Sequence, residues 1–95
     1  MEINHEKTDN GGVISAVHEG KPVAQLKYTR VGPKLFRIDD TRIRDQAKGR
    51  GVARKMMQKL VERAREKGAK IQTADDAARK MFEKHEQLHD IWDRG

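Results

Sequence analysis

The chain has 95 residues, of which 38% are charged and 35% hydrophobic, and its formal net charge is +6. This length fits one domain with a modest core and makes a second domain implausible. The positive charge favours an anionic partner, such as nucleic acid, an acidic membrane surface or a phosphorylated cofactor.

Two absences narrow the function classes. The sequence has no cysteine, which excludes disulfides, thiolate metal sites and cysteine nucleophiles. It has only four aromatic residues, too few for a platform that stacks single-stranded nucleic acid. No apolar stretch approaches the roughly 18 residues of a membrane span, and the N-terminus is no signal peptide. We therefore expect a cytoplasmic protein without a membrane partner.

The first half of the chain predicts short strands that form an antiparallel meander. We expect these strands over residues 13–17, 23–30 and 35–43. Three clusters of turn residues bound them: 9–12, 19–22 and 31–33. Alternation supports the second strand, where Ala24, Leu26 and Tyr28 share one face, and the third, where Phe36 and Ile38 do so.

The hydrophobic period then changes to that of a helix. Apolar residues predict a core-facing helix over Val52–Lys67, closed by Gly68. Its apolar stripe consists of Val52, Ala53, Met56, Met57, Leu60, Val61 and Ala64.

The last part of the chain predicts a short strand over residues 69–72 and a second helix. Thr73 and Asp76 have the spacing of a capping box at the start of this helix. Its expected inward residues are Ala77, Ala78, Met81 and Phe82. Residues 85–92 are expected to fold back on the body. The order of elements indicates one α+β domain over residues 1–95, with a mostly antiparallel sheet, a long central helix and a shorter C-terminal helix.

The segment Gln46-Ala47-Lys48-Gly49-Arg50-Gly51 runs directly into the long helix. Backbone N–H groups at a helix N-terminus lack internal partners and attract anions, and glycine lets a ligand approach the backbone. The segment therefore predicts a cradle for a pyrophosphate. A tight turn without a ligand is the alternative, in which the flanking cations are ordinary surface residues.

The same segment resembles the Q/R-x-x-G-x-G/A signature of the GNAT superfamily of acetyl-CoA-dependent N-acetyltransferases. The chain is most similar to a minimal branch of GNAT-like proteins of about its own length, the YjdJ-type proteins, over residues 12–91. Residues 38–41 resemble the I-x-H-T strand end of that branch, and residues 49–53 its G-x-G-I-G loop. Residues 64–71 resemble its A-R-E-x-G-x-K-I helix exit, and residues 82–91 its E-K-H-P-x-Y-x-D-V tail.

The resemblance implies a GNAT-like fold in which acetyl-CoA enters a gap where the fourth and fifth strands splay apart. The pyrophosphate would then meet the backbone amides of residues 48–53, and the pantetheine arm would pair with the strand near residues 41–43. The implied cofactor-binding residues are Thr41, Ile43, Gln46, Lys48, Gly49, Arg50, Gly51, Val52 and Ala53.

Two positions depart from the branch. Asp40 replaces its usual histidine, and residues 72–76 replace its P-x-C-P segment, with Asp75 or a neighbour in place of the cysteine. An acyl-cysteine intermediate is therefore impossible, and any acetyl transfer must be direct. Asp40 is the candidate catalytic base, although a carboxylate paired with arginine or orienting a substrate cation is the alternative. Asp75 and Asp76 also suit a helix start.

The histidines give no metal site. His5, His18 and His89 lack the spacing of metal ligands, and His85 suits a structural role under the C-terminal turn. The leading hypothesis is an N-acetyltransferase that moves acetyl from acetyl-CoA to an unidentified amine, as a monomer or weak homo-oligomer. A CoA-binding relative with impaired catalysis is the first alternative. A basic nucleic-acid-binding module is the second, although Glu62 and Glu66 interrupt the basic face of the long helix.

Overall fold

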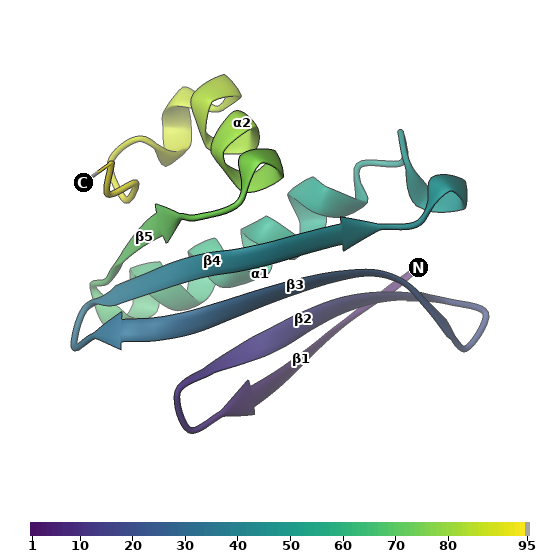
Figure 1. Ribbon diagram of the computed structural model, residues 1–95, viewed down its shortest axis with the longest axis horizontal. Coiled ribbons are helices and arrows are strands. Elements are labelled where there is room, and N and C mark those ends of the chain that lie inside the picture. Colours follow the sequence, from purple (N-terminus) through teal and green to yellow (C-terminus); the bar gives the residue numbers. More distant parts are fainter. Residues whose placement is uncertain (95) are drawn as a thin grey trace.

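The computed structural model describes residues 1–94, which form a five-stranded sheet with two α-helices (Figure 1). The predicted domain extends to Gly95, which lies outside the described residues. The elements in chain order are β1 (Glu2–Thr8), β2 (Gly11–His18), β3 (Lys21–Gly32), β4 (Leu35–Ile43), the 3₁₀ helix η1 (Asp45–Ala47), α1 (Val52–Lys67), β5 (Lys70–Thr73), α2 (Asp76–Lys84) and the 3₁₀ helix η2 (Glu86–Leu88).

The strands lie in the order β1-β2-β3-β4-β5. The first three pairings are antiparallel, and β5 joins β4 in parallel after the chain crosses over through α1. Helix α1 lies along one face of the sheet and contacts all five strands, whereas α2 lies beyond β5 (Figure 1). The predicted α+β class is confirmed, with its mostly antiparallel sheet, long central helix and shorter C-terminal helix.

The core lies between α1 and the sheet. The alternating positions Ala24, Leu26 and Tyr28 of β3 are all buried, as are Phe36 and Ile38 of β4. Of the predicted α1 stripe, only Ala53 is half-buried rather than buried. Gly68 ends α1 in the left-handed conformation, at φ 64°, as predicted. The patterned positions of sheet and helix therefore meet in one apolar layer.

Strand β1 is absent from the sequence prediction. It is an edge strand in which only Ile3 and His5 are half-buried, while its other residues are exposed. A strand that buries so little carries almost no hydrophobic alternation, because neither of its faces requires apolar residues.

A β-bulge in β4 changes which of its residues face α1. Lys27 pairs with Asp40 and Tyr28 with Ile38, so Asp39 is the extra residue. Directly opposite residues of an antiparallel pair share a face. Asp40 therefore lies with exposed Lys27 on the face away from α1. Such bulges often occur where a sheet carries a functional site.

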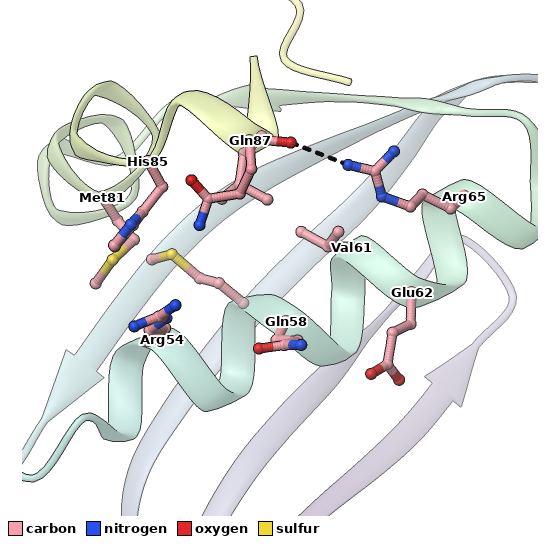
Figure 2. Close-up of a pocket in the computed structure, with 10 residues that line it drawn as sticks. Arg54, Gln58, Val61, Glu62, Arg65, Met81, His85 and Gln87 are labelled. Carbon is pink, nitrogen blue, oxygen red and sulfur yellow. Dashed lines mark hydrogen bonds between the residues drawn. The ribbon is translucent and has the colours of Figure 1, made fainter. Parts of the chain in front are cut away.

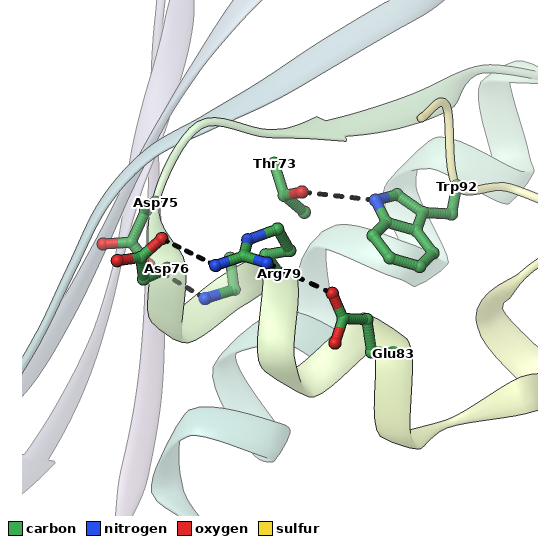
Figure 3. Close-up of polar contacts among 7 residues, drawn as sticks. Thr73, Asp75, Asp76, Arg79, Glu83 and Trp92 are labelled. Atoms are coloured by element: carbon green, nitrogen blue, oxygen red, sulfur yellow. Dashed lines mark hydrogen bonds and ion pairs between the residues drawn. The ribbon is translucent and has the colours of Figure 1, made fainter. Parts of the chain in front are cut away.

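The start of α2 agrees with the prediction in part: Asp75 and Asp76 lie at the helix start as expected, but the cap differs. The N-cap is Asp75, whose Oδ1 accepts the Ala78 N–H at 2.8 Å, so the capping box of Thr73 and Asp76 was wrong. Thr73 instead ends β5, and its Oγ1 accepts a hydrogen bond from Trp92 Nε1 (Figure 3). Ala77, expected to point inward, is exposed, because the cap at Asp75 places Ala78 and Phe82 on the buried side of the helix.

The C-terminal segment folds back on the sheet as predicted. Ile71 of β5 donates its N–H to the Ile91 carbonyl at 2.7 Å and accepts the Asp93 N–H at 2.8 Å. Trp92 packs 5.7 Å from Phe82, centroid to centroid. The segment therefore covers part of the edge that β5 would otherwise leave unpaired.

Candidate functional site

The glycine loop, residues 48–51, joins η1 to α1. Gly49 has φ 81° and Gly51, the N-cap of α1, has φ 71°. A Cβ atom built on either glycine would meet no heavy atom within 4 Å. Glycine is therefore required here by the left-handed backbone, and the space around the loop is open to a ligand.

The loop exposes backbone donors, although fewer than the sequence predicts. Lys48 N–H bonds to the Asp45 carbonyl at 3.2 Å, and Arg50 N–H to the Ala47 carbonyl at 3.3 Å. Among residues 1–94, the N–H groups of Val52 and Ala53 have no such partner, and Gly51 offers no capping side chain. The first turn of α1 also carries no acidic residue. Its positive end is therefore free to receive an anion.

The side chains around the loop are basic and exposed. Lys48 Nζ lies 3.0 Å from Asp45 Oδ1 in a solvent-exposed ion pair. Gln46 and Arg50 are exposed, and Arg54 follows in the first turn of α1. This arrangement attracts anions by long-range charge rather than by a dry, tightly paired site.

Strands β4 and β5 diverge beside this loop. Their parallel ladder ends at Ile38 and Thr73, and the Ala74 N–H then donates to the Ile38 carbonyl at 2.9 Å. Beyond that point, the next hydrogen bond between β4 and the start of α2 comes from Thr41, whose N–H donates to Asp75 Oδ2 at 3.0 Å. We call this divergence, bounded by residues 38–43 and 73–75, the splay.

Thr41 and Ile43 lie half-buried along the splay. Opposite Leu26, the Thr41 side chain shares the face that α1 covers, and its Oγ1 is buried without a hydrogen-bond partner. A buried hydroxyl without a partner is uncommon, and this one offers a hydrogen bond to a ligand that enters the splay. The Thr41 N–H, by contrast, is already occupied by Asp75. Thr41 and Ile43 bound the stretch of strand that was expected to pair with the pantetheine arm. Ile43 lies two residues beyond Thr41 on the same edge of β4.

Asp40 is not isolated in a pocket. Its Oδ2 accepts a hydrogen bond from Arg42 Nε at 2.8 Å, and its side chain is 40% exposed. The neighbouring bulge residue Asp39 accepts hydrogen bonds from Arg37 Nε and from the Thr29 hydroxyl. Both carboxylates therefore lie on the face away from α1, each paired with an arginine.

A groove of about 360 Å³ lies between α1 and the α2–η2 segment (Figure 2). It begins at Arg54, one turn after the glycine loop. Apolar side chains line much of it, and Arg65 bounds it through its bond to the Gln87 carbonyl at 3.1 Å. The full lining is Arg54, Met57, Gln58, Val61, Glu62, Arg65, Met81, His85, Gln87 and Leu88.

The sequence does not predict this groove. Its α1 residues recur every three or four positions along one flank of the helix, which is a visible signal. However, that flank lies at the border of the core stripe, so the same pattern also describes ordinary packing. Only the placement of Met81 and Leu88 opposite α1 distinguishes the two.

Arg65 also joins α1 to the C-terminal segment. Its guanidinium makes two hydrogen bonds to the Asp90 carboxylate, at 2.8 and 3.1 Å. The hydrogen bond from Arg65 lowers the pKa of Asp90. Paired, two-point contacts of this kind fix orientation better than a single contact does. The far end of the groove is therefore held in place by this pair.

Two of the histidines lie at the ends of η2. His85 lines the groove, and His89 Nε2 lies 2.8 Å from the Phe82 carbonyl. Within residues 1–94, no three His, Cys, Asp or Glu side chains are grouped as a metal ion would need. In the same part of the chain, neither helix combines the length and hydrophobicity that crossing a bilayer requires.

Comparison with known families identifies a match. The family model described as GCN5-related N-acetyltransferase matches residues 13–91, which include the glycine loop, the splay and the groove. No curated protein matches the chain in sequence.

Solved structures resemble the fold. A GCN5-like protein from Staphylococcus aureus, described as a candidate N-acetyltransferase, has a TM-score of 0.72 and 29% identity, with 94% of this chain and 86% of that one covered. The ribosomal-protein-alanine N-acetyltransferase from Brucella melitensis has a TM-score of 0.69 and 17% identity, with 81% of this chain covered. The chain spans 62% of that enzyme.

A third structure was solved with a ligand. It is an aminoglycoside N-acetyltransferase in complex with CoA, with a TM-score of 0.62 and 15% identity; the match covers 85% of this chain and 68% of that one. At such identity the likeness concerns the fold alone.

Proposed function

The chain belongs to the GCN5-related N-acetyltransferase family, and from this membership we propose that it binds acetyl-CoA and transfers the acetyl group directly to an amine. The observation that carries the proposal is the start of α1. There, N–H groups without partners, two left-handed glycines and a basic rim coincide beside the splay. A pyrophosphate is the ligand for which such a helix start is suited.

The binding residues proposed for acetyl-CoA follow from this arrangement. Gly49, Gly51, Val52 and Ala53 offer backbone to the phosphates, while Gln46, Lys48 and Arg50 surround them. Thr41 and Ile43 line the place of the pantetheine arm, where the unpartnered Thr41 Oγ1 offers a hydrogen bond. The groove beyond Arg54 adds apolar surface, chiefly from Met57 and Met81.

Acetyl-CoA supplies an acetyl group already activated as a thioester, so the chain needs no nucleophile of its own. In the transfer, the nitrogen of a neutral amine would form a bond to the acetyl carbon as the C–S bond of the thioester breaks, and CoA would leave as a thiolate that takes up a proton from water. The residues of the chain have three tasks: to hold the thioester in the splay, to admit the neutral amine and to accept the proton that its nitrogen loses. Asp40, or water beside it, is proposed to accept that proton. The Asp40–Arg42 ion pair is solvent-exposed, so the Asp40 carboxylate is accessible to a proton donor.

A second candidate function is CoA binding without efficient transfer. The observation that favours it is that two carboxylates beside the splay already accept hydrogen bonds. Asp40 pairs with Arg42, and Asp75 accepts two backbone N–H groups. If neither accepts a proton, the chain would bind the cofactor and hold it.

Isothermal calorimetry with CoA and acetyl-CoA tests the binding step, and CoA release with a panel of small amines and peptide amines tests transfer. Saturable binding of both ligands together with amine-dependent CoA release is the expected result. Binding without release from any amine supports the second candidate. No binding at millimolar ligand contradicts both. We further propose that residues 1–95 act as one domain in the cytoplasm, as a monomer or weak homo-oligomer.

A further inference from the structure

Asp75 joins the two sides of the splay. Its Oδ1 accepts the Ala78 N–H at 2.8 Å and so caps α2, as Figure 3 shows, while its Oδ2 accepts the N–H of Thr41, 34 residues earlier, at 3.0 Å. One carboxylate therefore binds the first turn of a helix and the middle of a strand. Its half-buried position limits competition from water.

The Thr41–Asp75 contact lies just beyond the point where β4 stops pairing with β5. The β4–β5 ladder ends at Ile38 and Thr73, and Ala74 adds one further bond to Ile38. Within residues 1–94, the α2-facing edge of β4 has no strand beside it from Asp39 onward. In this part of the chain, the bond from Thr41 to Asp75 is thus the one hydrogen bond that crosses the splay beyond Ile38.

We infer that Asp75 is a positioning residue that fixes the width of the splay. By holding Thr41 against the start of α2, it would set the distance between β4 and the β5–α2 corner. This inference rests on the proposed function, because the thioester of acetyl-CoA would lie between those two walls. Asp75 does not serve as the proton acceptor, since both of its oxygens are engaged with backbone donors.

The two contacts of Asp75 can be separated by substitution. Asparagine is as good an N-cap as aspartate, so Asp75→Asn retains the bond to Ala78 through its amide oxygen. Its other atom is an NH₂ group, which cannot accept the Thr41 N–H. Asp75→Ser is the second variant, because its single oxygen also caps without reaching both partners. Asp76→Asn, one residue on and exposed, removes the same charge as a matched control.

Amide hydrogen exchange measured by NMR gives a readout that needs no activity. In Asp75→Asn the Thr41 amide is expected to exchange about tenfold faster while the Ala78 amide is unchanged. In steady-state kinetics kcat is expected to fall at least about tenfold, because small misplacements of reacting groups are costly. The dissociation constant of CoA, governed mainly by the glycine loop, should change by less than roughly threefold. Asp76→Asn should leave all three quantities unchanged.

If Asp75 only caps α2, Asp75→Asn would change neither the exchange rate of the Thr41 amide nor kcat. That result would overturn the inference. Faster Thr41 exchange with unchanged kcat would also overturn it, because the contact would then be structural. A wild-type chain that shows no acetyl transfer refutes the proposed function and, with it, the role of Asp75 in that reaction. The exchange rates would still decide whether Asp75 holds the two walls together.

Discussion

His5 Nε2 on β1 lies 2.5 Å from the hydroxyl oxygen of Tyr28 on β3, although β2 separates their strands. Gly12 on β2 makes this contact possible. It lies directly opposite Tyr28, and a Cβ atom built on it would be 2.5 Å from that same hydroxyl oxygen. Because Gly12 has no side chain, the Tyr28 hydroxyl can pass over β2 and reach the edge strand.

Substitution of Gly12 by alanine should therefore destabilise the fold. The new methyl group would collide with the buried Tyr28 ring, and overpacking of this kind costs about 1–3 kcal/mol. Urea denaturation would measure the change in the free energy of unfolding. Gly32→Ala is the matched control, since its Cβ would meet only the Leu35 Cβ, at 3.6 Å, and it should cost far less. Equal costs at the two sites would contradict the steric explanation.

The pH dependence of stability should carry a contribution from His5. Burial, and then Arg63, Lys7 and Lys59 nearby, lower the pKa of His5 from its ordinary value of 6.5. The unfolded chain therefore binds a proton at His5 more readily than the folded chain does. The neutral ring is compatible with the fold above pH 6.5, and stability is lost as the pH falls through the lowered pKa.

Thermal unfolding of the wild type and of His5→Gln, compared across the range below pH 6.5, would measure this contribution. The wild type should lose stability more steeply than the variant as the pH falls, because the variant has no proton to take up at this position. The remaining histidines are common to both proteins and cancel in the comparison. Parallel pH profiles would argue against a role for His5.

Gly51 and Gly68 form a pair that separates binding from stability. Both adopt left-handed conformations at an end of α1, with φ 71° and 64°, and neither has atoms near its Cβ position. Alanine at either site should cost about 1 kcal/mol of unfolding free energy. Only Gly51→Ala alters the loop proposed to hold the phosphates, so only this variant should weaken CoA binding, by at least about tenfold. Calorimetry that finds equal weakening in both variants would contradict the proposed site.

Asp40 and Arg42 allow a test of the proton acceptor. Their ion pair is exposed, so Asp40→Asn and Arg42→Ala should each change the free energy of unfolding by less than about 1 kcal/mol. As the base, Asp40 would be required for transfer, and Asp40→Asn should lower kcat by about 100-fold or more. Arg42→Ala keeps the carboxylate and should remain active. Similar kcat values for all three proteins would assign proton removal to water.

The sequence predicted the elements that bury a regular pattern. The bounds of β4 and α1 agree with the prediction residue for residue, because both combine an apolar period with a clear glycine or turn at an end. Strand β1 was missed because Ile3 is its single apolar residue. The capping box of α2 was wrong, although Asp75 and Asp76 were rightly placed at the helix start. Thr73, Asp75 and Asp76 all suit a cap, and only the path of the chain chooses among them.

The candidate site was predicted less completely than the fold. The glycine loop could be located, because a left-handed backbone at a helix start has a local signature. The number of free N–H groups could not, since η1 engages those of Lys48 and Arg50. The groove and the Asp75–Thr41 bond join residues far apart in the chain, and no local pattern encodes such a pairing.

The extra residue in β4 also bears on how this sequence can vary. Phe36 and Ile38 face α1, and so do Thr41 and Ile43 opposite Leu26 and Ala24, although the two pairs differ in parity. Deletion of Asp39 would leave one residue between Ile38 and Thr41, so regular alternation would then place all four side chains on the α1 face. The deletion would remove the bulge and the Asp39 carboxylate, with its bonds to Arg37 and the Thr29 hydroxyl, without turning Thr41 or Ile43 toward solvent. The packing of β4 on α1 is therefore compatible with a strand of either length, and the face away from α1 is the one that depends on the extra residue.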